Sequence, residues 1–490
     1  MRYLGLDLGT GSAKAVLVGE DGAVVGEGTA PYAVRSPHPG WAESDPGEWW
    51  GGCAAAIRAA VGGRGREVRA LGLSGQMHGV VLSDADGRPL WPAVLWADAR
   101  SAGELGAYGE LGPGLLRALA NPPAVGMAGP SLLWLRENEP AAYRAARWAL
   151  QPKDWLRLRL TGEAAAEPSD ASATLLYDLE ADGWARAVVG ALGLRAELLA
   201  PIIPSASVAG ALTEEAALAL GLPAGIPVAA GAGDTPAAAL GTGLLEEGEV
   251  QLTVGTGGQI LAPRAGASGD PHRRTHLFRA AHDGEGGRFY AMAAVQNAGL
   301  ALEWALGVLG VSWGEAYREA FGVGPGAGGV VFLPYLTGER TPHFDPGARG
   351  AWLGLGLGHG RGHLLRAAFE GVAFALREGL EALEAAGVRA PELRLAGGGT
   401  AEGPWRRLLA DVLGRPLRVL PGGVASVASA RGGALLAGIA AEVYESASET
   451  LPLAPKPVDA VQPGDAEAYE EAYAAYGEGY PRLHERRPKV

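Results

Sequence analysis

A glycine–threonine–glycine turn between short apolar runs occurs twice in this chain, and no other feature of the sequence constrains the fold as strongly. The first turn, Gly9–Gly11, follows the apolar run Tyr3–Leu8. The second turn, Gly255–Gly257, follows Glu249–Val254 about 245 residues later. Apolar runs joined by short glycine-rich turns are typical of β-hairpins. We therefore expect two related halves, with the best boundary at Gly241–Gly248 because a strand pattern restarts after it.

Between and after the hairpins, apolar runs alternate with segments of helical periodicity. His363–Ala386 places apolar residues at i, i+4 spacing, which indicates a helix with one face in the core. Trp405–Leu413 is a second helix candidate. Leu451–Pro463 is predicted as a surface linker and Ala466–Tyr476 as a terminal helix. This alternation favours an α/β architecture over a sandwich or a helical bundle.

The charge balance and the cysteine content exclude several classes of function. The 490 residues carry 41 basic and 54 acidic side chains, a net charge of −13, which disfavours broad nucleic-acid binding because phosphates are repelled. One cysteine, Cys53, excludes an internal disulfide framework and a cysteine-rich zinc site. Asp7 interrupts any signal-peptide core, and the uncharged stretch Ala216–Gly233 contains prolines and glycines unsuited to a membrane span. We expect a cytoplasmic protein that binds neither membranes nor nucleic acid.

Known phosphate-loop and hydrolase templates do not fit this sequence. The chain has no G-x-x-x-x-G-K-[ST] and no G-x-S-x-G motif, and Lys14 stands where a dinucleotide fingerprint needs its third glycine. Two histidine pairs, His272/His276 and His359/His363, lie in segments rich in arginine and glycine without a nearby third ligand. We interpret these four residues as solvated loop histidines rather than metal ligands.

The glycine-rich turns are themselves candidates for a phosphate site. Consecutive backbone N–H groups can hold phosphate oxygens, and small residues let an anion approach closely. A single turn of this kind is weak evidence, since most are plain hairpin turns. The two turns together with Gly397–Gly399, a glycine triplet that opens a helix, fit a nucleoside triphosphate better, because that ligand needs several such contacts.

Two polar segments differ from their apolar surroundings. Ser74–Gly79 follows the apolar run Leu71–Leu73, so its polar groups project from a strand end, where ligands usually bind in α/β sheets. Taken alone, a turn with a capped histidine is the commoner explanation of this segment. Asp234 is the only charged residue between Glu215 and Glu246. A lone carboxylate in that setting is a helix N-cap, which is the commoner case, or a catalytic base.

Nine segments of the chain form an ordered set: LGLDLGTGSAK (4–14), SGQMHG (74–79), LWADAR (95–100), QPKDWLRLRLTGE (151–163), GAGDTPAAALGTG (231–243), LTVGTGG (252–258), GERTPHFDPGARGAWLGL (338–355), HLLRAAFEGVAFAL (363–376) and AGGGTAEGPWRRLLADVLGRP (396–416). In this order, and from Asp7 to about Gly438, they resemble the motifs of the FGGY carbohydrate kinases, and SGQMHG resembles the sugar motif of the xylulokinase members of that family. The resemblance implies two actin-like ATPase (ribonuclease H-like) α/β domains, residues 1–243 and 244–490, with an interdomain cleft.

The resemblance also implies roles for individual residues. Asp234 would accept the proton of the attacking sugar hydroxyl, and Asp7 would hold Mg²⁺ through water. The residues implied to contact ATP are Thr10, Gly11, Lys14, Gly255, Thr256, Gly257, Gly398 and Gly399. The residues implied to contact the sugar are Met77, His78, Trp96, Asp234 and Thr235.

The implied activity is ATP-dependent phosphorylation of the primary hydroxyl of a ketopentose, with D-xylulose giving D-xylulose 5-phosphate. Thr235 and Ala97 stand where the xylulokinase pattern commonly has asparagine, so a gluconokinase, a ribulokinase or a polyol kinase stays open. A non-enzymatic actin-like nucleotide-binding protein would share the two glycine turns but would have no use for SGQMHG. The implied partners are small molecules, the sugar and ATP, and a homodimer stays open.

Overall fold

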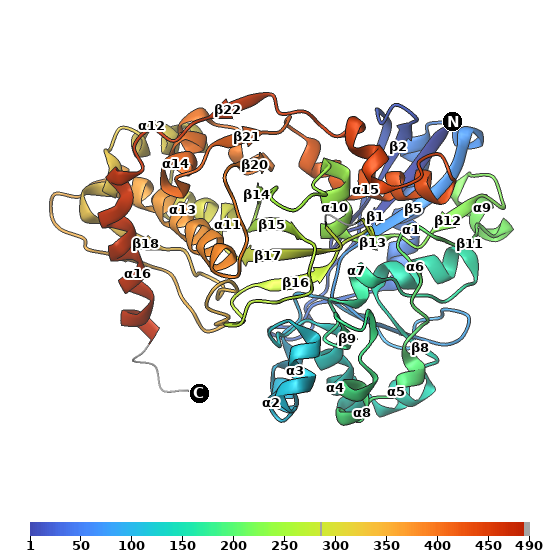
Figure 1. Cartoon of the computed structure of the whole chain (residues 1–490). Coiled ribbons are helices and arrows are strands. Elements are labelled where there is room, and N and C mark those ends of the chain that lie inside the picture. The colour runs from blue at the N-terminus through green and yellow to red at the C-terminus, as the bar shows by residue number, and fades with distance from the viewer. Residues whose placement is uncertain (285–286, 485–490) are drawn as a thin grey trace.

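Two mixed β-sheets organise the chain, and each is the centre of one half of the molecule (Figure 1). The computed structural model describes residues 1–284 and 287–484. The first sheet contains β1 (Arg2–Leu8), β2 (Ser12–Gly19), β3 (Val24–Pro31), β5 (Val68–Gly75), β11 (Val208–Ala211), β12 (Pro227–Ala229) and β13 (Ala232–Gly233). The second sheet contains β14 (Gln251–Val254), β15 (Gly258–Arg264), β16 (His276–Arg279), β17 (Phe289–Val295), β20 (Leu393–Ala396), β21 (Leu417–Val419) and β22 (Asp459–Val461).

The two sheets share one plan. The first has the strand order β11-β12-β5-β1-β2-β3, and the second has β22-β21-β20-β14-β15-β17 with β16 added outside β17. In each, the opening strand forms an antiparallel hairpin with the next strand and a parallel pair with a strand that arrives after a helical segment. The outermost strands β11 and β22 are antiparallel to their neighbours. The predicted hairpins and the two-half α/β architecture are confirmed.

The two faces of β1 differ, because successive side chains point to opposite sides of a sheet. Its leucines pack into the core beneath α1 (Pro46–Val61). Tyr3 packs on the other face, against α15 (Val424–Ala440). Asp7 lies an even number of residues from Tyr3, so it shares the α15 face at the carboxyl end of the strand.

Helix α15 approaches the first sheet closely, although it comes from the last part of the chain (Figure 1). A Cβ atom on Gly5 would lie 1.7 Å from the carbonyl oxygen of Ala430, and one on Gly72 would lie 1.9 Å from that of Gly433. Only glycine lets two backbones approach so closely. The same helix packs against α10 (Asp234–Thr242), so it ties the second half of the chain to the first sheet.

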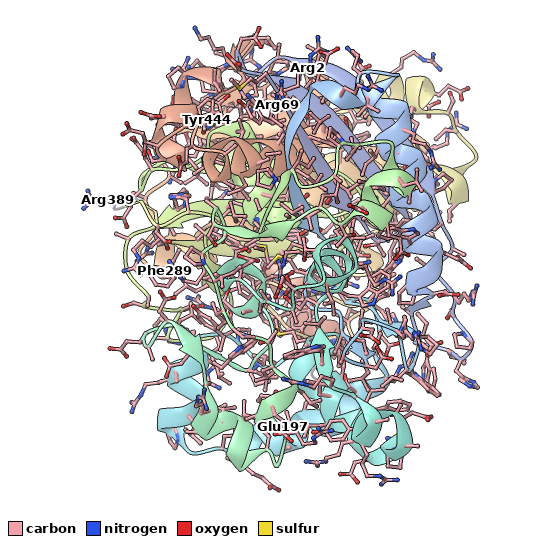
Figure 2. All side chains as sticks on the ribbon, turned by 90° about the vertical axis from the view of Figure 1, so that its right-hand side faces the viewer. Arg2, Arg69, Glu197, Phe289, Arg389 and Tyr444 are labelled. Carbon is pink, nitrogen blue, oxygen red and sulfur yellow. The ribbon has the colours of Figure 1, made fainter. Side chains whose placement is uncertain are left out.

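The segment after α15 extends this contact. The hydroxyl of Tyr444 donates a hydrogen bond to the carbonyl oxygen of Glu20 at 3.0 Å, and its ring lies 6.3 Å from that of Tyr3. In Figure 2, Tyr444 lies with Arg2 at the end of the molecule opposite Glu197. The expected domain boundary at residues 243 and 244 stays a prediction.

The other elements complete two helical layers. Residues 105–200 form a mainly helical block below the first sheet in Figure 1, and the long helix α13 packs on β15, β17 and β18 in the second half. The remaining helices are α2 (Leu105–Gly109), α3 (Pro113–Leu119), α4 (Ala128–Asn138), α5 (Pro140–Ala145), α6 (Pro152–Thr161), α7 (Pro168–Ala171), α8 (Arg186–Ala191), α9 (Glu214–Leu220), α11 (Gly299–Leu309), α12 (Trp313–Ala320), α13 (Arg361–Ala385), α14 (Gly403–Leu413) and α16 (Glu470–His484). The short strands are β4 (Glu43–Ser44), β6 (Val81–Ser83), β7 (Ala93–Val94), β8 (Trp148–Leu150), β9 (Tyr177–Asp178), β10 (Gly183–Trp184), β18 (Val331–Leu333) and β19 (Ala351–Leu353).

The three helix predictions are confirmed as α13, α14 and α16, although α16 begins at Glu470, four residues later than expected, and extends to His484. The prediction of a plain surface linker over Leu451–Pro463 is wrong: Asp459–Val461 pairs with β21 as the edge strand β22. An edge strand needs only one partner and can keep polar side chains in water, so it carries no strong apolar pattern. Within the part of the chain that the structure describes, every helix is too short or too polar to cross a bilayer.

Candidate active site

Parallel pairing brings the ends of three strands of the first sheet to one edge. Asp7 on β1 is in register with Ser74 on β5, and Gly233 at the end of β13 is in register with Gly75. The Ser74 hydroxyl donates a hydrogen bond to Asp7 Oδ1 at 2.9 Å. Burial raises the pKa of Asp7, while this hydrogen bond and the charge of Lys14 oppose the rise. The edge therefore holds a carboxylate that the protein only partly compensates.

Asp234 begins α10 at the same edge. Thr235 donates two hydrogen bonds to Asp234 Oδ1, from its backbone N at 2.6 Å and from its hydroxyl at 3.2 Å. Burial, and then the nearby charge of Asp7, raise the pKa of Asp234 to about 7, although the two hydrogen bonds act in the opposite direction. The helix N-cap is Gly233, so capping does not account for this carboxylate. A carboxyl group with this pKa is suited to accept a proton near neutral pH.

A buried ionic cluster lies behind Asp234. The Lys153 ammonium contacts the carboxylates of Asp154, Glu167 and Asp170 at 2.5, 3.2 and 3.3 Å, and all four side chains are buried. Burial alone would lower the pKa of Lys153, but the three carboxylates hold it above its usual value. The cluster keeps a full positive charge inside the protein.

One hydrogen-bond chain links this cluster to the backbone just before Asp234. Ser169 Oγ donates to Glu167 Oε1 at 2.9 Å and accepts from the backbone N of Gly233 at 3.0 Å. Sequence reasoning assigned no role to these residues. The only signal was that 151–163 resembles a family motif, whereas the cluster forms through the fold.

The first glycine–threonine turn is fastened on several sides. The carbonyl of Gly9 accepts hydrogen bonds from Tyr32 Oη at 2.5 Å and Gln76 Nε2 at 3.4 Å. Thr10 Oγ1 accepts one from Trp96 Nε1 at 2.8 Å. Gly11 is exposed, and the Lys14 ammonium donates to the carbonyl of Ser426 in α15 at 3.1 Å. These hydrogen bonds fix the turn on its protein side, and Gly11 remains exposed to solvent.

The second turn and the glycine triplet lie side by side in the second half, because β14 and β20 are parallel neighbours. The carbonyl of Gly255 accepts from Gly299 N at 2.9 Å, and that of Thr256 accepts from the N atoms of Ala298 and Leu300 at 3.1 and 3.0 Å. These bonds dock the turn on the start of α11. Gly255 and Thr256 are exposed.

The glycine triplet shows where glycine is required. Gly397 has a φ of 105°, and a Cβ there would lie 2.1 Å from the carbonyl oxygen of Val254. A Cβ on Gly399 would lie 3.1 Å from the same oxygen, while one on Gly398 would meet no protein atom within 4 Å. The two adjacent loops thus form a surface of backbone with few side chains, as a phosphate or nucleotide site requires.

Met77 and His78 lie where the two halves meet. Tyr290 of β17 donates its hydroxyl to Met77 Sδ at 3.7 Å, and the ring of Phe278 in β16 lies 5.8 Å from that of His78. His78 has a φ of 72°, and its Nδ1 is 2.8 Å from the carbonyl oxygen of Ala173. Burial lowers its pKa to about 4, so the ring is neutral near pH 7. Both halves therefore contribute side chains around Met77 and His78.

One of the histidine interpretations is wrong. His276 is buried in β16, stacks on Phe278 at 5.3 Å between ring centroids and lies 3.3 Å from Asn121 Oδ1 through its Nδ1. Its four-residue strand is too short to be recognised from periodicity. His272 is exposed, as expected, and His359 and His363 are partly exposed. Across residues 1–284 and 287–484, no group of three His, Cys, Asp or Glu side chains could hold a metal ion by itself.

Trp96 joins the two parts of the site. Its Nε1 bonds Thr10 of the first turn, and the guanidinium of Arg340 lies 5.2 Å from its ring centroid. Arg340 comes from the segment between β18 and β19 in the second half. Sequence reasoning named no role for Arg340, although the residue lies within the family-like segment 338–355. Ala97, next to Trp96, is exposed.

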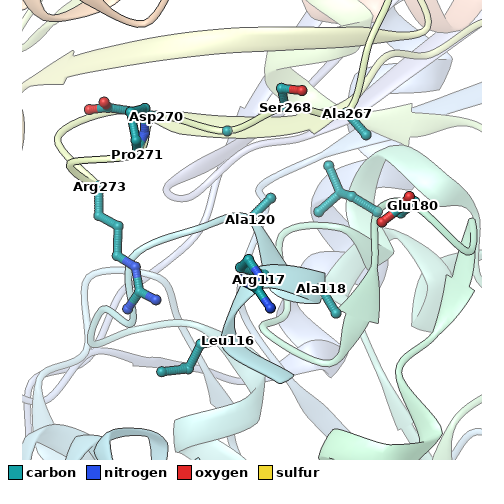
Figure 3. A pocket seen from close by; sticks show the side chains of 12 residues that line it. Leu116, Arg117, Ala118, Ala120, Glu180, Ala267, Ser268, Asp270, Pro271 and Arg273 are labelled. Atoms are coloured by element: carbon teal, nitrogen blue, oxygen red, sulfur yellow. The ribbon is translucent and has the colours of Figure 1, made fainter. Parts of the chain in front are cut away.

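A surface groove of about 700 Å³ lies elsewhere, between α3 and the segment before β16 (Figure 3). Arg117, Glu180 and Arg273 are among its lining residues. None of the residues that the sequence predicted for the site lines it. We therefore place the candidate active site at the strand ends and not in this groove.

Comparisons with known proteins identify the family of the chain. Models of the N-terminal and C-terminal domains of the FGGY family of carbohydrate kinases match residues 2–241 and 250–441. The xylulose kinase of Escherichia coli (strain K12) is 37% identical over 486 residues, 99% of each chain. A solved xyloylose kinase from Brucella ovis has a TM-score of 0.91 at 35% identity, covering 99% of this chain and 100% of that one. The gluconate kinase of Lactobacillus acidophilus, at 23% identity and 98% coverage of both chains, shares the fold with a TM-score of 0.90. With both domains and both sheets accounted for, the chain belongs to the FGGY family of carbohydrate kinases.

Proposed function

We propose that this kinase transfers the γ-phosphoryl group of ATP to the primary hydroxyl of a ketopentose and converts D-xylulose to D-xylulose 5-phosphate. The observation that carries the proposal is Asp234, a desolvated carboxylate with a pKa of about 7 at the strand edge. Phosphoryl transfer needs an oriented nucleophile and charge stabilisation, and a base of this kind supplies the first. The E. coli relative, a xylulose kinase, supports the choice of sugar.

Asp234 is the catalytic base in this proposal. Thr235 occupies its Oδ1, and Oδ2 has no hydrogen-bond partner among the described residues, so Oδ2 is the atom that takes the sugar proton. The sugar O–H bond breaks as the new O–P bond forms, and the bond from the γ-phosphorus to ADP breaks. Thr235 keeps the carboxylate oriented, which accounts for its position beside the sugar.

Met77, His78 and Trp96 bind the sugar. Met77 supplies an apolar wall, and Trp96 offers a ring face for the apolar side of the sugar. His78 donates its Nδ1 hydrogen to the carbonyl of Ala173, because that carbonyl can only accept. The neutral ring thus presents Nε2 as an acceptor for a sugar hydroxyl.

ATP lies across both halves. Thr10, Gly11 and Lys14 contact its phosphates from the first half, and Gly255, Thr256 and Gly257 contact them from the second. Gly398 and Gly399 let the nucleotide lie against the start of α14. Exposed backbone at both turns and the open space at Gly398 support these roles.

Asp7 holds Mg²⁺ in this proposal. The fit rests on one observation: Asp7 is a desolvated carboxylate at the strand ends, and the Ser74 hydrogen bond and the charge of Lys14 only oppose the rise of its pKa, so a cation would compensate its charge. Mg²⁺ usually keeps several waters and binds through one or two carboxylates plus substrate phosphates, which suits such a site. When bound, the ion neutralises charge on the phosphates.

A substrate panel tests the function. Sugar-stimulated ADP release is measured with D-xylulose, D-ribulose, gluconate, xylitol and glycerol under identical conditions. We expect the highest kcat/KM with D-xylulose. A higher value for gluconate, ribulose or a polyol would assign the enzyme to that sugar, and Thr235 and Ala97 would then be the first residues to examine. ATP turnover that no sugar stimulates would contradict a sugar kinase altogether.

We also propose a homodimer. Helix α11 exposes Trp304 and Val308 one turn apart, and α12 begins with the exposed Trp313. Exposed large apolar side chains are common at interfaces between copies of a chain. Light scattering during gel filtration gives the mass directly. A mass near 50 kDa, that of one chain, would contradict the proposal.

A further inference from the structure

Arg340 brings a positive charge without a hydrogen-bonded partner to the Trp96 side of the candidate site. Among the described residues, no carboxylate or carbonyl accepts a hydrogen bond from its guanidinium, and its contact with the Trp96 ring at 5.2 Å is the interaction that positions it. Burial lowers the pKa of Arg340, yet arginine remains charged in proteins. A partly buried guanidinium without a partner is costly unless a ligand supplies acceptors.

The neighbouring carboxyl does not neutralise this charge. Glu339 Oε1 accepts hydrogen bonds from the backbone N atoms of Gln296 at 2.6 Å and Arg340 at 2.8 Å. Its Oε2 is buried without a partner. Burial, the largest cause, raises the pKa of Glu339 to about 8, so the group is mainly neutral near pH 7. Glu339 therefore compensates the charge of Arg340 only in part and accepts no hydrogen bond from its guanidinium.

The loop that carries Arg340 packs beside the residues around His78. Four residues after Arg340, the ring of Phe344 lies 5.2 Å from that of His276, and the ring of Phe278 lies 5.3 Å from His276 and 5.8 Å from His78. The positive charge of Arg340 also lowers the pKa of both histidines. Its guanidinium therefore lies on the Trp96 and His78 side of the candidate site.

His78 and Arg340 together offer one acceptor and one set of donors. His78 Nε2 accepts only, because Nδ1 carries the hydrogen that bonds Ala173. The guanidinium donates only. An α-hydroxyketone, a hydroxyl next to a carbonyl, matches this pair: the hydroxyl donates to His78, and the carbonyl oxygen, which cannot donate, accepts from Arg340.

We propose that Arg340, supplied by the second half, is a specificity-determining residue that binds the carbonyl oxygen of a ketose and, with His78 Nε2, selects a ketose over the corresponding polyol. The inference rests on the proposed function. It identifies the residues that recognise the carbonyl end of the ketose, which is the end opposite the phosphorylated hydroxyl. A polyol replaces the carbonyl with a hydroxyl, whose hydrogen then faces a positive charge or must rotate away.

The test compares a ketose with its polyol in the full-length enzyme. kcat and KM are measured for D-xylulose, xylitol and ATP with the wild type, Arg340→Gln and Arg340→Lys. We expect Arg340→Gln to lower kcat/KM for D-xylulose by about 10- to 100-fold, the effect of losing a charged hydrogen bond, mainly through KM. The KM for ATP and the activity on xylitol should change by less than about threefold. Arg340→Lys should recover part of the preference for the ketose.

Arg117→Gln is the matched control, since Arg117 is exposed on α3 in the surface groove and its loss should leave all parameters unchanged. If the wild type phosphorylates D-xylulose but Arg340→Gln lowers the ketose and polyol activities equally, the assignment of Arg340 is overturned while the proposed function stands. If the wild type prefers the polyol, both are overturned. If Arg340→Gln raises KM for ATP alone, Arg340 belongs to the nucleotide site instead.

Discussion

The two halves of this kinase repeat one strand plan but differ at the position two residues before the glycine–threonine turn. In the first half the next-to-last residue of β1 is Asp7, and in the second half the next-to-last residue of β14 is Thr253. Their parallel partners differ in the same sense: Ser74 donates a hydrogen bond to Asp7, whereas Thr253 faces Ala396. One edge is charged and polar, and the other is neutral.

Helix α10, which follows β13, and helix α15, which follows β21, repeat this difference. Helix α10 begins with Asp234, whereas α15 begins after Gly422 and Gly423. The two helices also pack against each other. A triphosphate is repelled by carboxylates unless a cation lies between them, so a neutral edge suits nucleotide binding and a charged edge suits proton transfer. In the proposed function the charged end carries Asp234 and Asp7 beside the first phosphate turn, whereas the neutral end carries nucleotide contacts alone, and the following variants test that difference.

Removing the base should have the largest effect. Asp234→Asn should lower kcat for sugar phosphorylation by about 10²–10⁴-fold, because a general base contributes that much, while ATP binding persists. Coupled ADP release gives kcat, and calorimetry gives the affinity for ATP. Near wild-type turnover would exclude Asp234 as the base.

The same variant should be more stable at high pH. The folded-state pKa of Asp234, about 7, is raised above its usual value of 3.8, so ionisation opposes folding and the free energy of unfolding falls as pH rises between these values. Asparagine cannot ionise, so the variant avoids this fall in the free energy of unfolding. The melting temperature of Asp234→Asn should therefore exceed that of the wild type at pH 8 and equal it near pH 3.5. A lower melting temperature at pH 8 would show that the carboxylate contributes structurally.

Neutralising the other carboxylate should shift the pH profile. Activity should rise with pH through about 7 as Asp234 loses its proton. Because the charge of Asp7 helps to raise that pKa, Asp7→Asn should move the midpoint of kcat/KM to lower pH and also reduce kcat by about 10-fold or more. Asp86→Asn, which removes an exposed carboxylate, is the control. An unchanged midpoint would show that the charge of Asp7 does not affect the pKa of Asp234.

Adding charge to the neutral edge should weaken ATP binding. Thr253→Asp places a carboxylate at the position that matches Asp7, and a like charge several ångströms from a triphosphate costs about 1–3 kcal/mol. We expect KM for ATP to rise about 5- to 100-fold and KM for the sugar to stay unchanged. Thr253→Asn, of the same size without the charge, should have little effect. Equal effects of both variants would attribute the change to packing.

Local sequence patterns predicted the hairpins and the helices of the fold. The two hairpins and the helix α13 follow from apolar spacing and glycine turns. The candidate segment Ser74–Gly79 follows from polar groups after an apolar run, and Asp234 from its isolation among uncharged residues, whereas Asp7 was a candidate only through the family resemblance. The resemblance of the ordered motifs supplied the two-domain fold and the chemistry. The individual roles of the site residues stay predictions.

Contacts between distant segments explain what the sequence did not reveal. The approach of Gly5 to Ala430 joins residues more than four hundred positions apart, and neither has a periodic signal. His276 looked solvated because it follows arginines, yet its strand packs against the first half. Nothing in the local sequence distinguishes Arg340 from other loop arginines, because its position over Trp96 arises only from the fold.

The smallest expected effect separates two neighbouring glycines of the neutral edge. Gly397→Ala should destabilise the protein by about 1–3 kcal/mol, because its φ of 105° is strained for alanine and its Cβ would lie 2.1 Å from the carbonyl oxygen of Val254. Gly398→Ala should leave the melting temperature unchanged, because no protein atom lies within 4 Å of its Cβ. If the nucleotide lies against Gly398, the added methyl should still raise KM for ATP by several-fold, at about 1 kcal/mol. An unchanged KM for ATP in Gly398→Ala would remove this glycine from the nucleotide site and leave Gly397 as a residue that serves the fold alone.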